Sequence, residues 1–423
     1  MRFMPNSREN SQQPKLWTPV FVVIILIALC AFVVGQGLNA GSTVYINRLG
    51  GGATLAGIGA GVFSAAAGVA RIIGGPLADL RGRLITMAIG GVVLVVGVLG
   101  MAITANPDLF LLWRFMQGVG FAFVTTTAAT AAADVLPVKR LGEGIGYYGL
   151  GQALAMSFGP ALAITLVACD PPEMLYWGLG IPAVFALVAC VFCRYEKHPD
   201  TLPETATYRT MAKQRENNPS KEKPRLINSI LEPGALAGAI PIMVISPAMG
   251  FAIFFSGLLG TSLGVGNAGI FYTLSAVTMI VVRLASKSFM DRTPAIKIHA
   301  VAVLGGVVGF GMLIVAATAD LDPGTRSVLF CAAGLPYGLC PGLAIPVNQT
   351  VAVKNSSAER WGAANGLFLL LVDVGIGVAA TIWGITNDMF GFPFTLGCVI
   401  VLVIASLGVA YLCYPADDKR WRR

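Results

Sequence analysis

The sequence predicts an all-α integral membrane protein, with twelve transmembrane helices in two pseudo-symmetric six-helix bundles. Hydrophobic residues make up 56% of the chain and charged residues only 12%, whereas soluble domains average about 25% charged residues. The apolar residues form long blocks, many of about 18 residues or more, which is enough to cross a hydrocarbon core about 30 Å thick as a helix. A single long polar stretch near the middle of the chain divides these blocks into two sets of six.

Turn residues between the apolar blocks set the limits of the spans. An Asn-Pro-Asp turn at residues 106–108 and an Asp-Pro-Gly turn at residues 322–324 are examples. The first block is too long for the core of a signal peptide, so we expect it to be retained as the first span. The predicted spans are residues 18–40, 53–78, 84–104, 108–134, 144–168, 174–193, 234–258, 267–290, 297–318, 327–352, 362–385 and 393–414.

The polar stretch between the halves predicts a linker, because it is rich in Lys, Arg, Pro, Asn, Glu and Thr and contains no apolar block. We therefore divide the chain into a first six-helix bundle at residues 1–193, a cytoplasmic linker loop at residues 194–232, and a second six-helix bundle at residues 233–423.

The distribution of Lys and Arg predicts that both termini are cytoplasmic. In this orientation only Arg48 and Arg326 fall in outward loops, whereas the basic linker and both basic ends lie inside. We expect a multi-pass protein of the cell inner (plasma) membrane, with the lipid bilayer as its surroundings. The basic inner loops account for the net charge of +8, so no nucleic-acid partner is expected.

Two patterns repeat between the halves. Arg71 precedes Asp79 by eight residues at the inner end of span 2, and Arg283 precedes Asp291 by eight residues at the inner end of span 8. Arg-Leu-Gly before span 5 and Arg-Trp-Gly before span 11 form a second repeated pair. Duplicated six-helix units of this kind predict a site between them near the middle of the membrane.

The loop between spans 2 and 3 has the composition of a tight turn at a helix end. The glycines permit close backbone approach, and the acid can pair with a basic residue or meet a helix N-terminus from the other half. The copy in the second half has Lys287 and Pro294 where the loop has its two glycines, which implies a weaker contact there. A solvated turn is the alternative. The loop reads Gly75-Pro-Leu-Ala-Asp79-Leu-Arg81-Gly82-Arg83.

Span 4 contains a charged residue, Arg114, followed by Gln117 on the same helical face. A charge inside a span costs at least about 2.5–3.5 kcal/mol on insertion scales, so it is a functional candidate. The alternative is an arginine near the outer end of the span that extends to the membrane surface.

Span 11 contains an acid, Asp373, eleven residues beyond Gly362 and so about 16 Å along a helix, close to the middle of the membrane. Small residues share its face, which favours an orientation toward protein rather than lipid. Removal from water favours the protonated form of a carboxyl group, so Asp373 could exchange protons near neutral pH. A structural acid hydrogen-bonded between helices is the alternative.

These motifs resemble those of the major facilitator superfamily. The loop between spans 2 and 3 is similar to the signature G-x-L-A-D-x-x-G-R, and span 4 is similar to the R-x-x-Q-G-x-G signature of its drug/proton antiporters. Span 5 ends in Gly159-Pro160 and is similar to the antiporter signature only in part, because Ala161 follows where further glycines are typical. The resemblance implies that Asp373 and Arg114 act in proton coupling. It also implies a conformational latch formed by Gly75, Asp79, Gly82, Arg83, Arg283 and Asp291.

Other polar and aromatic residues within spans are candidates for lining a substrate cavity, although each is as readily explained by helix packing. These candidates are Gln36, Asn39, Gln117, Gln152, Phe251, Phe255, Tyr272, Asn348 and Asn365.

We therefore expect a monomeric secondary transporter, not an enzyme, whose partners are protons and a small-molecule substrate. It would export amphipathic drugs or a metabolite in exchange for protons by alternating access. The alternative is a proton-coupled carrier of a defined solute, such as a metallophore, a sugar or a nucleoside, and a non-transporting receptor is a third hypothesis. No cofactor and no metal site are predicted.

Overall fold

The computed structural model describes residues 15–416 apart from 105, 138–139, 199, 201, 203, 207, 210–231, 290–292 and 357–360. Regular structure in the described residues is helical, apart from one antiparallel bridge between Pro137 and Ala206. The helices of the first half are α1 (Pro19–Arg48), α2 (Gly52–Arg81), α3 (Arg83–Thr104), η1 (Pro107–Leu109), α4 (Phe110–Val135), α5 (Leu141–Ala168) and α6 (Met174–Cys190). Those of the second half are η4 (Pro233–Ala235), α9 (Leu236–Ser262), α10 (Gly269–Phe289), α11 (Ala295–Thr318), α12 (Pro323–Ala332), α13 (Gly334–Lys354) and α14 (Trp361–Cys413).

Every predicted span falls on a helix, with one difference in how the helices are divided. The span predicted at residues 327–352 is formed by α12 and α13 together. The spans predicted at 362–385 and 393–414 are confirmed as two helices, which share the label α14 and are separated by non-helical backbone at Gly391, where φ is 80° and ψ is 170°. Only glycine adopts this φ without steric cost, so a single residue turns the chain back into the membrane.

The lengths and compositions of the helices fit a multi-pass membrane protein. In the described part of the chain, nine helical segments are long and apolar enough to cross a membrane, and one of them, Gly366–Cys413, contains the bend. Two shorter helices, α6 and α10, are also apolar. Large apolar side chains point outward around the helices: Ile181 is 73% exposed, Val328 69% and Leu412 79%. Such side chains suit contact with lipid.

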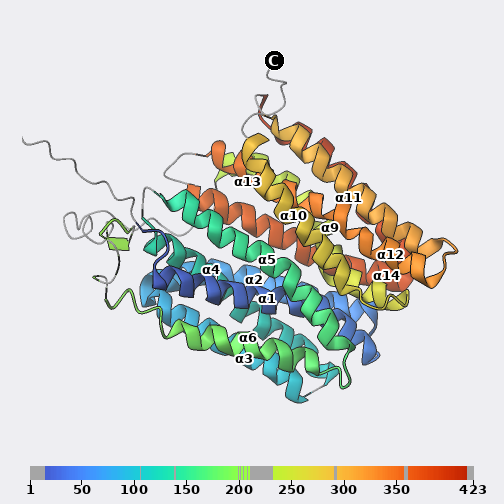
Figure 1. Ribbon diagram of the computed structural model, residues 1–423, viewed down its shortest axis with the longest axis horizontal. Helices are drawn as coiled ribbons and strands as arrows, with labels where there is room; N and C mark the ends of the chain where they lie inside the picture. Colours follow the sequence, from blue (N-terminus) through green and yellow to red (C-terminus); the bar gives the residue numbers. More distant parts are fainter. Residues whose placement is uncertain are drawn as a thin grey trace, which may run out of the picture.

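The helices pack into two groups (Figure 1). We call α1–α6, drawn in blue to green, the first bundle, and α9–α14, drawn in yellow to red, the second bundle. Inside the first bundle α3 packs on α4 and α1 on α5, and inside the second α9 packs on α14 and α11 on α13. Across the boundary α2 packs on α14, α5 on α10, and α1 on α9. Span 2 (α2) therefore contacts span 11 (the first part of α14), and span 5 (α5) contacts span 8 (α10). A two-fold repeat generates such a pair of contacts, because spans 2 and 8 occupy corresponding positions in the two halves, as do spans 5 and 11.

The bundles touch closely toward one end of the molecule. We call the end where α1 begins and α14 ends the terminal face, and the other end, which includes the α1–α2 loop, the opposite face. Near the opposite face a methyl group on Gly57 would lie 2.6 Å from the carbonyl oxygen of Ala380, and one on Gly384 would lie 2.6 Å from that of Ala53. Glycine at these positions lets α2 and the first part of α14 approach backbone to backbone.

Candidate functional site

An ion pair joins the two bundles within their membrane-spanning helices, in the half of each helix nearer the terminal face. Arg71 Nε lies 2.9 Å from Asp373 Oδ2, and the side chains are 21% and 25% exposed. Arg71 comes from α2 and Asp373 from α14, so the pair crosses the boundary between the bundles. Both charges lie within their helices rather than at the ends. An isolated charge at such a position in a membrane span would be costly. The two paired atoms are buried and form no hydrogen bond to another described group, so the contact between them is electrostatic.

Arg114 is buried inside the first bundle, where its partners are neutral. Its side chain is 1% exposed, which excludes the alternative that it extends to the membrane surface. Nη2 donates to Asn39 Oδ1 at 2.7 Å, Nη1 donates to Gln117 Oε1 at 3.2 Å, and Nε donates to the carbonyl oxygen of Gly59 at 3.2 Å. Among the described residues Arg114 forms no ion pair, so its charge is compensated by neutral groups.

Two phenylalanine rings lie between Arg114 and the ion pair. The Arg114 guanidinium is 4.5 Å from the centroid of Phe63, the rings of Phe63 and Phe121 are 5.6 Å apart, and the Arg71 guanidinium is 5.8 Å from the centroid of Phe121. Both arginines are within the distance at which a ring face attracts a cation. The two residues predicted for proton coupling, Arg114 and Asp373, are thus connected through Phe63, Phe121 and Arg71 rather than by direct contact.

The predicted latch loop is held on the first bundle. Gly82 ends α2 with φ of 97°, and Arg83 Nε lies 2.9 Å from Asp134 Oδ2 at the end of α4. The Tyr195 hydroxyl donates to the same Asp134 oxygen at 3.0 Å, and Glu196 accepts a hydrogen bond from the backbone N–H of Leu84 at 3.1 Å. Burial and the neighbouring carboxylates raise the pKa of Tyr195, so it remains a donor. The chain after α6 therefore fixes the loop.

The other predicted latch residues are only partly described. Gly75 and Asp79 lie within α2, and Arg283 lies within α10. The side chain of Asp79 and the whole of Asp291 lie outside the described residues, so the latch remains a prediction.

The predicted cavity candidates are in different surroundings. Asn39 and Gln117 bind Arg114. Gln36 and Gln152 are partly buried, and the side chain of Asn365 lies outside the described part of the structure. Gln36 Oε1 is buried without a hydrogen-bond partner among the described residues. A substrate or a water molecule could donate a hydrogen bond to this oxygen.

The remaining candidates lie inside the second bundle. Phe251 and Phe255 are fully buried and stack at 5.8 Å between ring centroids. The Tyr272 hydroxyl donates to the carbonyl oxygen of Ile253 at 3.3 Å and accepts from the N–H of Gly257. These contacts are those of core packing within a bundle.

Asn348 belongs to a buried polar network of the second bundle. Its Nδ2 lies 3.0 Å from His299 Nδ1, its Oδ1 accepts from Tyr414 at 2.8 Å, and His299 Nε2 lies 3.2 Å from Ser406 Oγ. The network satisfies its own polar atoms, so it needs no ligand.

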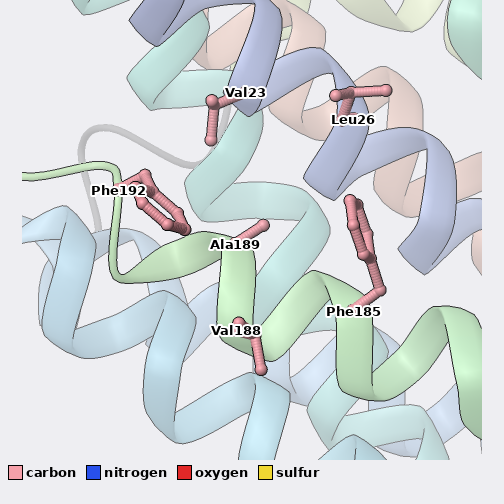
Figure 2. A pocket seen from close by; sticks show the side chains of 6 residues that line it. All are labelled: Val23, Leu26, Phe185, Val188, Ala189 and Phe192. Atoms are coloured by element: carbon pink, nitrogen blue, oxygen red, sulfur yellow. The ribbon is translucent and has the colours of Figure 1, made fainter.

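An apolar pocket lies elsewhere, between α1 and α6. Figure 2 shows Val23 and Leu26 of α1 facing Phe185 and other side chains near the end of α6. Its volume is about 340 Å³ and its lining is entirely apolar. It contains none of the charged residues described above. The lining residues are Val23, Leu26, Phe185, Val188, Ala189 and Phe192.

Sequence reasoning did not identify the partner of Asp373 or the connecting rings. Arg71 was visible as part of the repeat, but a repeat does not indicate which helix crosses which. Phe63 and Phe121 are aromatic residues in apolar helices and carry no signal that separates them from ordinary core residues.

The chain is similar to known transporters. Residues 20–334 match the sequence profile of the Major Facilitator Superfamily. The staphylopine export protein of Staphylococcus aureus is 23% identical over 93% of this chain and 96% of that protein. The multidrug transporter MdfA of Escherichia coli O6:H1 is 26% identical over 73% of each chain.

Solved structures share the fold at low sequence identity. A D-xylose–proton symporter superposes with a TM-score of 0.71 at 13% identity, covering 95% of this chain and 98% of the other. The nucleoside transporter NupG superposes with a TM-score of 0.67 at 15% identity, covering 94% and 98%. These likenesses concern the fold alone.

Proposed function

Because this chain belongs to the Major Facilitator Superfamily, and so is a membrane transporter and not an enzyme, we propose that it exports amphipathic drugs or a metabolite by proton-coupled alternating access. The observation that carries the proposal is the ion pair between Arg71 and Asp373. It places the acid within a span against a cation of the other bundle, and part of the acid's side chain remains exposed.

Protonation of Asp373 would remove the charge that attracts Arg71 across the boundary. At effective dielectric constants typical of partly exposed pairs, opposite charges a few ångströms apart attract by several kcal/mol before desolvation is counted. Loss of this attraction weakens one of the interactions that hold α2 against α14. A proton can therefore bias the equilibrium between two arrangements of the bundles, as a coupled carrier requires.

The same pair provides a basis for exchange. A substrate with a cationic group would be attracted to the carboxylate of Asp373, which a proton also occupies. Two ligands that compete for one group are not carried together, so outward movement of one accompanies inward movement of the other. Arg114 would support this site through Phe63 and Phe121, which place its charge behind Arg71.

We assign the terminal face to the cytoplasm, because the basic linker belongs to that side. The close contacts near Gly57 and Gly384 then close the extracellular side. The conformation would accordingly be inward-facing and ready to accept a substrate from the cytoplasm.

Transport in liposomes tests the proposal. The purified chain would be reconstituted with a pH-sensitive dye inside, an imposed pH gradient, and a panel containing a cationic dye, an antibiotic and a metal chelator. At least one compound should cause a proton flux that Asp373→Asn abolishes and Asp320→Asn, a change at an exposed loop acid, leaves intact. Full activity of both Asp373→Asn and Arg114→Ala would remove these residues from coupling.

A second candidate is the alternative function, a proton-coupled carrier of one defined solute such as a metallophore. It is supported by the coverage of the relatives: the protein named for export of a single compound, staphylopine, aligns over 93% of this chain, whereas the multidrug transporter MdfA aligns over 73%. The same panel separates the two functions. Flux with one chemical class alone favours the defined solute, and flux with several unrelated compounds favours drug export.

A further inference from the structure

An acid of the second bundle caps a helix of the first bundle. Asp388 Oδ2 accepts a hydrogen bond from the backbone N–H of Thr54 at 2.7 Å, and Oδ1 accepts one from that of Ala53 at 3.2 Å. Both N–H groups belong to the first turn of α2, where the backbone has donors without partners in its own helix. The contact crosses the boundary between the bundles at the opposite face.

The first turn of α2 has no cap of its own. Its capping residue is Gly51, which has no side chain to accept a hydrogen bond. The positive end of the helix dipole favours a carboxylate at this place. Asp388 therefore supplies from another bundle what a Ser, Thr, Asp or Asn normally supplies from the same chain segment.

The charge of Asp388 is not stabilised by its position in its own helix. It lies three residues before Gly391, where the first part of α14 ends in a bend. A negative charge near the C-terminal end of a helix is unfavourable, because the backbone carbonyls there are already partly negative. Its favourable interaction is the one with α2.

The contact continues the close packing of α2 on α14. One turn further into the membrane, Gly57 and Gly384 bring the same two helices together backbone to backbone. Opening the opposite face must separate these helices, and separation breaks both hydrogen bonds of Asp388. The contact consequently exists in one of the two states of the carrier and not in the other.

We propose that Asp388 is a gating residue, which holds the opposite face closed and so sets the balance between the two states of the transport cycle. This inference rests on the alternating-access function proposed above. Hydrogen bonds to a charged group are stronger than neutral ones. Because Asp388 is exposed, we expect its removal to shift the balance by about tenfold rather than by the larger factor of a buried pair.

Hydrogen exchange of the full chain in lipid nanodiscs, read by mass spectrometry, tests the gate without a known substrate. In Asp388→Ala, exchange should rise in residues 53–64 and 377–388 near the opposite face. It should fall in residues 69–74 toward the terminal face, since opening one face closes the other. This reciprocal change separates gating from local loosening.

Two further variants complete the experiment. Asp320→Ala removes an exposed acid of the second bundle near the same face and should exchange like the unmodified chain. Asp388→Asn keeps an acceptor but loses the charge, so it should give a smaller reciprocal change, and it is available if Asp388→Ala does not fold. A rise confined to residues 53–56, or no change at all, would overturn the proposal.

The outcome is independent of the test of transport. If the unmodified chain produces no substrate-dependent proton flux, the proposed function fails whatever the exchange pattern is. If the flux is present and the exchange pattern does not change, only the gate is wrong.

Discussion

Asn39 accepts a hydrogen bond from Arg114 at 2.7 Å, and the two side chains are 6% and 1% exposed. A guanidinium so deeply buried depends on every oxygen it contacts, because water cannot replace a lost acceptor. Asn39 is thus as important to the charged centre of the first bundle as the arginine itself.

Asn39→Ala should lower the free energy of unfolding by about 1–3 kcal/mol, the cost of leaving a buried donor unsatisfied. Asn39→Asp should lower it less, since a carboxylate can accept the same bond and also neutralise the charge. Thermal unfolding in detergent, followed by tryptophan fluorescence, measures both. Asn47→Ala changes an exposed residue of the same helix, and an equal effect of Asn47→Ala and Asn39→Ala would contradict this role.

Phe121→Leu should weaken proton coupling, because the leucine side chain offers no ring face to Arg71. A cation–π contact contributes about 0.5–2 kcal/mol, so the substrate-dependent proton flux should fall about two- to thirtyfold. Phe121→Tyr should retain most of the flux. Phe115 lies on the same helix and is 51% exposed, so Phe115→Leu is the matched control. The rings have no part in coupling if the two leucine variants behave alike.

Tyr195→Phe should destabilise the chain by about 0.5–1.5 kcal/mol, because it removes the hydroxyl that binds Asp134 while keeping the ring. The raised pKa of Tyr195 means that its contribution is present below the unfolded tyrosine pKa of about 10 and is lost only as pH rises above it. The difference in stability should therefore be constant from about pH 6 to 9. The measurement is the unfolding of Tyr195→Phe over this pH range, with Tyr147→Phe as the control because Tyr147 is 40% exposed. A loss of stability that grows within the range would contradict the assignment.

Gly384→Ala should prevent full closure of the opposite face, because the added methyl group would lie 2.6 Å from the Ala53 carbonyl oxygen. Hydrogen exchange in residues 53–64 should rise. Gly397 is in the same helix with open space beside it, so Gly397→Ala should leave the exchange unchanged. Equal exchange in the two variants would show that the close approach is not needed for closure.

The fold could be predicted from the sequence because long apolar blocks and turn residues record each crossing of the membrane. The exact ends of the helices could not be predicted. The span at 327–352 is divided into α12 and α13, and the helix predicted to end at residue 385 continues to the bend at Gly391. Asp388 therefore lies beyond the predicted span but within α14, where it caps α2.

The charged residues could be identified, but their partners could not. An acid or an arginine within a span is conspicuous against apolar neighbours, so Asp373 and Arg114 were found. Their contacts depend on which helices cross, and that information is distributed over the small residues of both bundles. Asn348 shows the same limit, because a polar residue within a span can face a cavity or, as here, bind His299.

The exchange of partners between the bundles has a consequence for the ion gradient. α2 packs on α14 and α5 packs on α10, so two equivalent crossings border the same interface, and each helix extends from one face to the other. A rotation that separates the helices at one face presses them together at the second. Under the proposed alternating-access mechanism, a pore open to both compartments would require both crossings to loosen at once, so this topology would limit a leak of protons.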